Sequence, residues 1–410
     1  MDKAQFYREA RTDLPGPLAG IRVLEATTTW AGPMCGCILA DFGADVIKIE
    51  LPGGEVSRHV VPFLPGTNPP VSFMHASVNR NKRSLTLDLR RPDGHDLFLR
   101  LAERADIIVE NFRPGVMHHY GIGYDEVRKV RPDIVYVSIS GYGHFGPDRA
   151  RAGYDVLSQA RSGFLSLNGN PEGSPVRAPT YFGDDLGGLH AALAALAALR
   201  HRDRTGEGQH VDIALLDSVL FQSNGFLTLA AMGVKLERLG NEFPFAVPAN
   251  AYRCRDGGYV MIVILVDAHW RAAARLIGRP ELGHHPDYAT VGARVARRDE
   301  LNAMMAEWAA QHTVDEAVKI FAAEGLSISP VQTYADSARD PQVLARDMLQ
   351  PTAQEDGSVV PLTGPAAKFS RTPTRIRSGA PALGAHTDEI LRGLGLDSSE
   401  LARLREGKII

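Results

Sequence analysis

The feature that most constrains the fold is an alternation of short apolar runs with helical patterns over the first half of the chain. Residues 21–26 (Ile-Arg-Val-Leu-Glu-Ala) and 45–50 (Asp-Val-Ile-Lys-Ile-Glu) are typical of strands, and Pro33 lies where a helix reaching residue 42 begins. The pattern returns, with strands expected at 85–89, 107–109, 134–138 and 210–214 and a helix at 92–104. Strands that alternate with helices pair in parallel, so the sequence predicts an α/β fold whose parallel sheet is covered by helices.

This alternation stops near residue 226. From there to residue 326 we expect one strand at 259–265 and helices that begin at His269 and Asp299. These elements predict a smaller second domain. A further helix is expected at 399–406, but periodicity leaves open whether the C-terminal tail rejoins the first domain.

Composition narrows the class of protein. The 410 residues suit two domains, and three cysteines are too few for a disulfide framework. A net charge of -3 lacks the basic excess of nucleic-acid-binding proteins. Residues 1–14 do not resemble an export signal, and the longest apolar helical stretch, 191–199, is shorter than the ~20 residues of a membrane span. We therefore expect a soluble cytoplasmic protein with neither nucleic acid nor membrane as a partner.

Several common catalytic motifs are absent from the sequence. No G-x-G-x-x-G follows the first strand, and there is neither a Walker A sequence nor an H-E-x-x-H. The adjacent histidines at 118–119 and 284–285 do not share a helix face, so they do not predict a metal site. These observations disfavour dinucleotide oxidoreductases, nucleoside triphosphatases and zinc proteases.

The segment Gly183-Asp184-Asp185-Leu186-Gly187-Gly188 stands before an Ala/Leu-rich helix that is expected to reach residue 201. One interpretation is a capping pair that satisfies free backbone N–H groups. The other is a nucleophile: the helix dipole keeps Asp184 ionised, and the glycines let a bulky thioester approach it. The motif alone leaves both interpretations open.

Two other segments have both a ligand-binding and a structural interpretation. The basic run at 79–84 (Asn-Arg-Asn-Lys-Arg-Ser) suits phosphates or a solvated turn. The run at 110–115 (Glu-Asn-Phe-Arg-Pro-Gly) follows a strand end, where parallel sheets usually bind ligands, or is a simple connection to a helix. We interpret the run at 204–209 as structural.

Taken in order, the motifs of this chain resemble the class III CoA-transferases, a family that includes formyl-CoA transferase and the carnitine CoA-transferases. The matching stretches extend over nearly the whole sequence, at residues 17–25 (Pro-Leu-Ala-Gly-Ile-Arg-Val-Leu-Glu), 31–33 (Ala-Gly-Pro), 41–50 (Asp-Phe-Gly-Ala-Asp-Val-Ile-Lys-Ile-Glu), 81–84 (Asn-Lys-Arg-Ser), 110–115, 153–155 (Gly-Tyr-Asp), 183–184 (Gly-Asp), 205–209 (Thr-Gly-Glu-Gly-Gln) and 383–388 (Leu-Gly-Ala-His-Thr-Asp). Several spaced motifs in one order are far more specific than any single motif.

The resemblance implies a particular architecture. A large Rossmann-like, CoA-binding domain is built from both chain ends, residues 1–225 and 330–410, and a small domain, 226–329, is inserted between them. Two ring-like subunits interlock, either as a homodimer or as a heteromer with a related CoA-transferase subunit.

The resemblance also implies the site residues. The family's catalytic aspartate falls on Asp184, and Asp185 occupies a position where other members carry a different residue. Positions that correspond to CoA-binding residues are Thr29, Trp30, Ala31, Leu87, Arg90, Asn111, Phe112, His119, Tyr120 and Tyr154. The implied reaction passes through an aspartyl anhydride and an aspartyl-CoA thioester, with oxyanions stabilised by N–H groups at the helix start. Coenzyme A is a substrate here, and no metal or redox cofactor is expected.

The sequence departs from formyl-CoA transferase at two positions and in one loop. Trp30 replaces a glutamine, Leu51 replaces an arginine near the adenine, and the glycine-rich loop over the intermediates has no counterpart. An aromatic wall at Trp30 suits an acid larger than oxalate or formate. We therefore expect succinyl-CoA as donor and an aryl- or alkylsuccinate as acceptor.

Two rival functions remain. An α-methylacyl-CoA racemase shares this fold, but that branch uses the histidine of a Gly-His-Asp motif as a base, and here the segment is Gly153-Tyr154-Asp155. Phenols, with an ordinary pKa of about 10, are poor bases near neutrality. The other rival is a non-catalytic subunit of a hetero-oligomeric transferase, and the presence of Asp184 argues against it.

Overall fold

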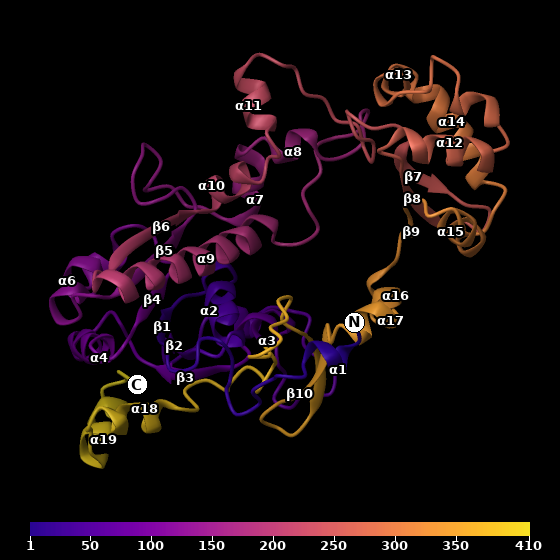
Figure 1. The fold of residues 1–410 in the computed structure, drawn as a ribbon. Helices are drawn as coiled ribbons and strands as arrows, with labels where there is room; N and C mark the ends of the chain where they lie inside the picture. The colour runs from indigo at the N-terminus through magenta and orange to yellow at the C-terminus, as the bar shows by residue number, and fades with distance from the viewer. The chain divides into compact units, whose positions relative to one another are not determined.

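The computed structural model describes all 410 residues and divides into two compact units (Figure 1). Unit 1 comprises Met1–Phe164, Ala178–Leu227 and Pro341–Ile410. Unit 2 comprises Leu165–Arg177 and Thr228–Asp340. Each unit has its own hydrophobic core, and each is described by itself.

Unit 1 is built on a six-stranded sheet in which every pair of neighbouring strands is parallel. The strand order, β3-β2-β1-β4-β5-β6, is that of doubly wound α/β proteins. The strands are β1 (Arg22–Ala26), β2 (Asp45–Glu50), β3 (Lys82–Thr86), β4 (Ile107–Glu110), β5 (Val135–Ser140) and β6 (Gln209–Ala214). The predicted α/β fold with a central parallel sheet is thus confirmed.

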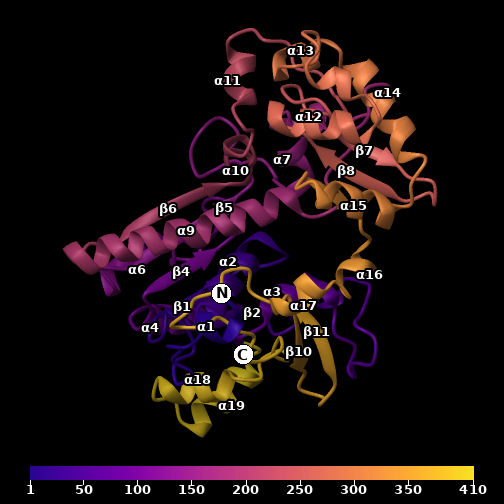
Figure 2. The same ribbon diagram turned by 45° about the vertical axis from the view of Figure 1, so that its right-hand side comes forward.

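One face of this sheet is covered by α2 (Ala31–Asp41) and α9 (Phe182–Thr205), which pack against each other (Figure 2). Alternate strand residues, such as Val23 of β1 and Val109 of β4, point to this face and are fully buried. They meet Cys35 and Leu39 of α2 and the alanines of α9. Small residues on α9 therefore let a long helix lie close to the sheet.

The opposite face is covered by helices from both ends of the chain. Leu24 and Ile108 belong to this core, with Phe98 of α4, Leu391 of α18 and Leu401 of α19. The covering helices are α4 (Pro92–Ala102), α5 (Val116–His119), α6 (Tyr124–Val130), α18 (Thr387–Gly393) and α19 (Ser398–Glu406). The C-terminal residues are therefore part of unit 1.

The other elements of unit 1 are short and lie around this sheet. They are α1 (Lys3–Phe6), the 3₁₀ turn η1 (Val56–His59), α3 (Phe73–Asn79), α7 (Asp155–Arg161), α10 (Leu215–Phe221), α17 (Pro341–Ala345) and the hairpin of β10 (Leu349–Ala353) and β11 (Val359–Thr363). Two helices, α8 (Phe164–Leu167) and α11 (Phe226–Ala231), span points where the chain passes between units.

Unit 2 has an antiparallel sheet covered by helices around the fully buried Trp270. Its strands are β7 (Ala249–Arg253), β8 (Tyr259–Val263) and β9 (Ile328–Pro330). Its helical elements are α12 (Asp267–Leu276), η2 (Pro280–Gly283), α13 (Val291–Ala296), α14 (Arg298–Ala309), α15 (Val314–Ala323) and α16 (Tyr334–Ser337). No helix in either unit combines the length and the apolar composition that a bilayer crossing requires.

Candidate active site

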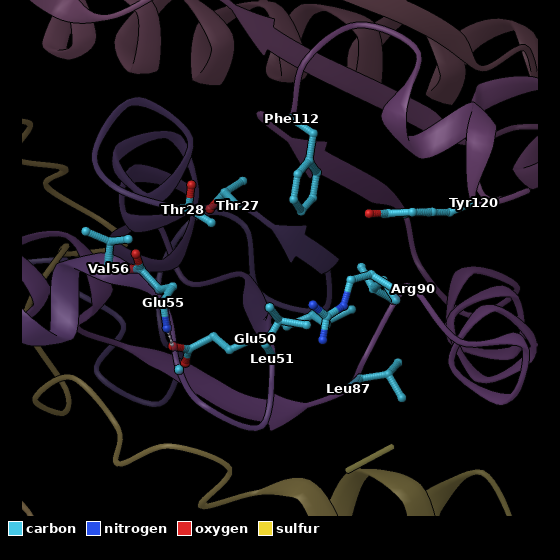
Figure 3. A pocket seen from close by; sticks show the side chains of 13 residues that line it. Thr27, Thr28, Glu50, Leu51, Glu55, Val56, Leu87, Arg90, Phe112 and Tyr120 are labelled. Carbon is cyan, nitrogen blue, oxygen red and sulfur yellow. Dashed lines mark hydrogen bonds between the residues drawn. The ribbon is translucent and has the colours of Figure 1, made fainter. Parts of the chain in front are cut away.

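A pocket of about 270 Å³ opens at the carboxyl ends of the first four strands of the sheet (Figure 3). The strand order reverses between β1 and β4, and the carboxyl edge at such a switch point is where open α/β sheets bind ligands. The lining residues come from the end of β2 and from the segments that follow β1, β2, β3 and β4: Thr27, Thr28, Ile49, Glu50, Leu51, Gly54, Glu55, Val56, Leu87, Leu89, Arg90, Phe112 and Tyr120. Most of the lining is apolar or aromatic, so the pocket suits a flat apolar group with a few polar edges.

Four of the CoA-binding positions that the sequence predicts line this one pocket: Leu87, Arg90, Phe112 and Tyr120. Figure 3 shows Tyr120 and Arg90 on one side of the pocket, with Thr28 and Glu55 on the other. The Arg90 guanidinium is held by Asp88, with N–O distances of 2.8 Å. The structure thus brings together residues that lie as far apart in the sequence as Leu87 and Tyr120.

The remaining predicted positions do not line the pocket. Asn111 holds the neighbouring turn, because its amide accepts from Thr28 N–H and donates to the Thr28 carbonyl, both at 2.8 Å. His119 is exposed, and the 65% exposed Tyr154 precedes α7. Thr29 and Trp30 lie in the turn from β1 into α2, and Ala31 is the first residue of that helix.

Asp184 is the third residue of α9, and this corrects the position expected from sequence. The helix begins at Phe182, with Tyr181 preceding it, so the Gly-Asp-Asp-Leu-Gly-Gly segment lies inside the first turns. Asp184 is half-buried, and no hydrogen bond contributes to the environment of its carboxylate. The capping interpretation is therefore wrong for Asp184.

Burial is the main reason why the pKa of Asp184 is raised to about 7, and the negative charges of Asp155 and Asp185 add to the effect. The expectation that the helix start keeps this carboxylate ionised is thus contradicted. A carboxylate that is poorly solvated and near its pKa at neutral pH is a candidate catalytic group.

The N–H groups at the start of α9 are occupied by Asp155, a buried residue of α7. One of its carboxylate oxygens accepts from Gly183 N–H at 2.6 Å and lies 3.4 Å from Asp184 N. The Gln159 side chain donates to the other oxygen at 2.7 Å. In this structure, therefore, these two N–H groups are not free to stabilise an oxyanion, contrary to the expectation from sequence.

The glycines of the α9 segment serve close packing. A Cβ at Gly188 would lie 2.8 Å from the carbonyl oxygen of Ala31 and from Cβ of Met34, both in α2. A Cβ at Gly187 would lie 2.5 Å from the Leu215 side chain, and one at Gly183 would overlap Ser158. Close packing therefore explains these glycines, whereas the expectation that they make room for a thioester stays a prediction.

Trp30 lies next to the Asp184–Asp185 pair. Its indole N–H donates to Asp185 at 2.6 Å, and its ring packs at a tilt on Tyr181, with 4.9 Å between centroids. All three side chains are half-buried. Burial raises the pKa of Asp185, whereas the bond from Trp30 opposes that rise. An aromatic surface therefore flanks the first turn of α9.

The basic run at 79–84 is structural, and the phosphate interpretation is wrong. β3 begins at Lys82, three residues earlier than expected. Arg80 pairs with Asp41 at 2.6 Å, and the fully buried Lys82 side chain pairs with Glu25 at the same distance. Arg83 pairs with Asp45 on the neighbouring strand. With their charges already matched within unit 1, these side chains are not poised for a phosphate.

Sequence reasoning missed a buried polar cluster behind the pocket. Lys48 lies 3.3 Å from Glu25 on the adjacent strand and 3.5 Å from Glu55, all with nearly inaccessible side chains. Glu55 in turn accepts from Thr29 N–H at 3.0 Å. A sequence signal was present, since opposite charges stand in register within the otherwise apolar strands β1 and β2.

Comparison with curated proteins gives relatives that match along almost the whole chain. An acyl-CoA transferase from Fusarium pseudograminearum is 37% identical over 96% of this chain and 88% of its own length. The β subunit of a succinyl-CoA–L-malate CoA-transferase from Chloroflexus aurantiacus is 36% identical over 96% of this chain and 98% of its own length. A succinyl-CoA–D-citramalate CoA-transferase from the same organism is 34% identical, covering 97% and 98%.

A solved structure shows the same fold. The crystal structure of a CaiB/BaiF family protein from Brucella suis superposes with a TM-score of 0.82 at 35% identity, covering 93% of this chain and 100% of that one. Residues 18–387 match the sequence family described as CoA-transferase family III. The chain belongs to CoA-transferase family III, as the order of its motifs predicts.

Proposed function

We propose that this protein transfers coenzyme A from succinyl-CoA to a second carboxylic acid through covalent intermediates on Asp184. The observation that carries the proposal is the environment of Asp184, a half-buried carboxylate whose pKa is raised to about 7 by burial, Asp155 and Asp185. Little solvation energy has to be removed before such a carboxylate attacks an acyl carbon. The pocket lined by Leu87, Arg90, Phe112 and Tyr120 would hold part of the CoA moiety.

The reaction proceeds by two matched exchanges. The Asp184 carboxylate attacks the thioester carbonyl and the C–S bond breaks. CoA departs as the thiolate, and the acyl group and Asp184 now form a mixed anhydride. The thiolate then attacks the aspartyl carbonyl of that anhydride, which releases the donor acid and leaves Asp184 as a CoA thioester. The acceptor carboxylate attacks this thioester and expels the thiolate. Attack of the thiolate on the acceptor's own carbonyl then gives the new CoA ester and regenerates Asp184.

The names of the relatives support the substrate class. Two of them are named for succinyl-CoA with L-malate or D-citramalate, and both of these acids are succinates that carry substituents. Trp30 and Tyr181 form an aromatic surface next to Asp185, which suits a substituent on the acceptor. We therefore propose a substituted succinate as acceptor, aryl- or alkylsuccinates included.

A panel assay tests this function. Purified protein is incubated with succinyl-CoA and, in turn, L-malate, citramalate, methylsuccinate, phenylsuccinate, glutarate and formate, and new CoA esters are identified by mass spectrometry. We expect esters of the substituted succinates and exchange of labelled succinate into succinyl-CoA. Folded protein that yields neither would overturn the proposal. Rapid α-deuterium uptake by 2-methylacyl-CoA in deuterated water, without any acceptor acid, would favour the racemase alternative.

We further propose that the active form is an interlocked homodimer located in the cytoplasm. Leu193 of α9 is 63% exposed and Phe221 of α10 is 79% exposed, beside β6 at the open edge of the sheet. Apolar side chains at an unpaired strand edge favour association. A heteromer with a related subunit is the alternative, because relatives include chains named as α and β subunits of one transferase.

A further inference from the structure

The turn from β1 into α2 contains a strained residue. Thr29 has φ +70°, in the left-handed region, where a β-branched side chain is rarely found. Such a conformation persists only where surrounding contacts determine it, and these residues gather at functional sites. The contacts that hold Thr29 are therefore informative.

Glu55 holds this turn from a distant part of the chain. Its Oε2 accepts from Thr29 N–H at 3.0 Å, and the same oxygen accepts from Ser57 N–H at 2.9 Å. Ser57 Oγ donates to its other oxygen. Glu55 is only 7% exposed, although it is one of the residues that line the pocket. One carboxylate thus ties the loop after β2 to the turn after β1.

Glu55 is in turn fixed by a closed ring of buried side chains, of which none is more than 7% exposed. The members, each in contact with the next, are Glu55, Lys48, Glu25, Lys82, Asn79, His75 and Ser57. Two carboxylates balance two ammonium groups, and burial lowers the pKa of His75 to about 4, which keeps it neutral. Polar networks of this kind add little to stability but select one geometry.

The turn that Glu55 holds sets the position of Trp30. Trp30 follows Thr29 directly, and its indole N–H donates to Asp185 at 2.6 Å, next to Asp184. We propose that Glu55 is a positioning residue that holds Thr29 in its left-handed conformation and thereby fixes Trp30 against Asp185 beside the reacting carboxylate. This inference rests on the proposed function of Asp184, but the geometry of the turn can be tested separately.

A double-mutant cycle tests the role of Glu55. Glu55→Gln keeps the shape of the side chain and removes its charge, so we expect kcat for succinate exchange into succinyl-CoA to fall by about 10²-fold, with KM changing much less. Glycine adopts positive φ without strain, so adding Thr29→Gly should recover about 10-fold of the lost kcat. Lys48→Met, which removes the charge that Glu55 neutralises, should not restore kcat in the Glu55→Gln background.

The opposite pattern would overturn the proposal. If Glu55 served only to neutralise Lys48, Lys48→Met would rescue Glu55→Gln and Thr29→Gly would not. A loss of activity that merely follows the folded fraction, measured by calorimetry, would equally contradict a positioning role. Each rate is therefore expressed per folded molecule.

Fluorescence separates this inference from the proposed function. The emission of Trp30 is obtained as the difference between each protein and its Trp30→Phe counterpart, since the chain has three tryptophans. We expect Glu55→Gln to make Trp30 more accessible to acrylamide, and Thr29→Gly to reverse part of that change. If even the wild-type protein moves no CoA, the proposed function fails, whereas this signal still decides the role of Glu55. Unchanged quenching in Glu55→Gln would sink the inference.

Discussion

Asp184 has an environment that works against its ionised form. Burial and the neighbouring Asp155 and Asp185 all raise its pKa, and the N–H groups at the helix start are already bound to Asp155. The folded protein therefore carries a destabilising charge at the position of the proposed nucleophile. Such local cost is common at catalytic positions, where the same lack of solvation that weakens the fold speeds the reaction.

The raised pKa predicts the pH dependence of the rate. Only ionised Asp184 can attack a thioester, so kcat/KM should fall about tenfold per pH unit below about pH 7 and level off above it. The measurement is succinate exchange between pH 5 and 9. A rate that stays constant from pH 5 to 8 would be inconsistent with Asp184 as a buried nucleophile.

Substitution of Asp184 should separate activity from stability. The pKa of Asp184 is about 7 in the folded protein and 3.8 in the unfolded chain. The stability that this carboxyl group contributes is therefore fully present below pH 4 and is lost as pH rises through 7. An asparagine side chain cannot ionise, so Asp184→Asn should abolish transfer yet gain stability over the wild type as pH rises. The gain in the free energy of unfolding should be on the order of 2 kcal/mol. This is less than the full pKa shift of Asp184 would give, because solvent still screens a half-buried carboxyl group. Urea unfolding at pH 5 and 8.5 measures it.

Asp217→Asn is the matched control. The Asp217 carboxyl group lies in the first turn of α10, outside the proposed site. Its pKa is also raised, mainly by burial and to a smaller extent by the negative charge of Asp212. We expect this variant to retain transfer. If Asp184→Asn transfers CoA at a rate comparable to that of Asp217→Asn, or is less stable than the wild type at high pH, the account of Asp184 is contradicted.

At the scale of elements, α9 positions the site by packing closely on its neighbours. Gly183, Gly187 and Gly188 stand where α9 meets α7, α10 and α2, respectively. Glycine normally weakens a helix, so three glycines in two turns indicate that close approach matters more here than helix propensity. The position of the Asp184 backbone therefore depends on these contacts.

Gly188→Ala tests this packing. Its Cβ would lie 2.8 Å from a main-chain oxygen of α2, which cannot yield as a side chain would, so we expect a loss of about 1–3 kcal/mol in the free energy of unfolding. Gly393→Ala, at the end of α18, has no atom within 4 Å of the added Cβ and should be neutral or slightly stabilising. Denaturant titration compares the two. Equal effects would mean that close packing is not the reason for Gly188.

Local patterns predicted most elements of the sheet, since strands buried on both faces are continuous apolar runs. The prediction failed where partners are remote. Lys82 looked like a solvated loop residue because its partner, Glu25, lies in another strand. In the same way, motif order pointed to Asp184, but the contacts of Asp155 and Glu55 with distant backbone N–H groups form only in the folded chain.

At the scale of the whole molecule, the unpaired side of β6 and the exposed Leu193 and Phe221 predict association with another subunit. If the subunits interlock, dissociation requires partial unfolding, so dilution alone should not release monomers. Sedimentation velocity over a hundredfold range of concentration should show a constant dimer that retains full activity. A monomer that forms reversibly on dilution would argue against interlocked subunits, and activity that needs a second, different chain would favour a heteromer.

The central claim is that Asp184 itself carries the acyl group and then CoA, and trapping tests it most directly. The protein is incubated with succinyl-CoA and hydroxylamine, which converts an aspartyl anhydride or thioester to a hydroxamate, and peptides spanning 178–200 are sequenced by mass spectrometry. We predict loss of activity that parallels a single hydroxamate on Asp184, with none in Asp184→Asn. A hydroxamate on Asp185, or full transfer activity without any modified carboxylate, would contradict this account.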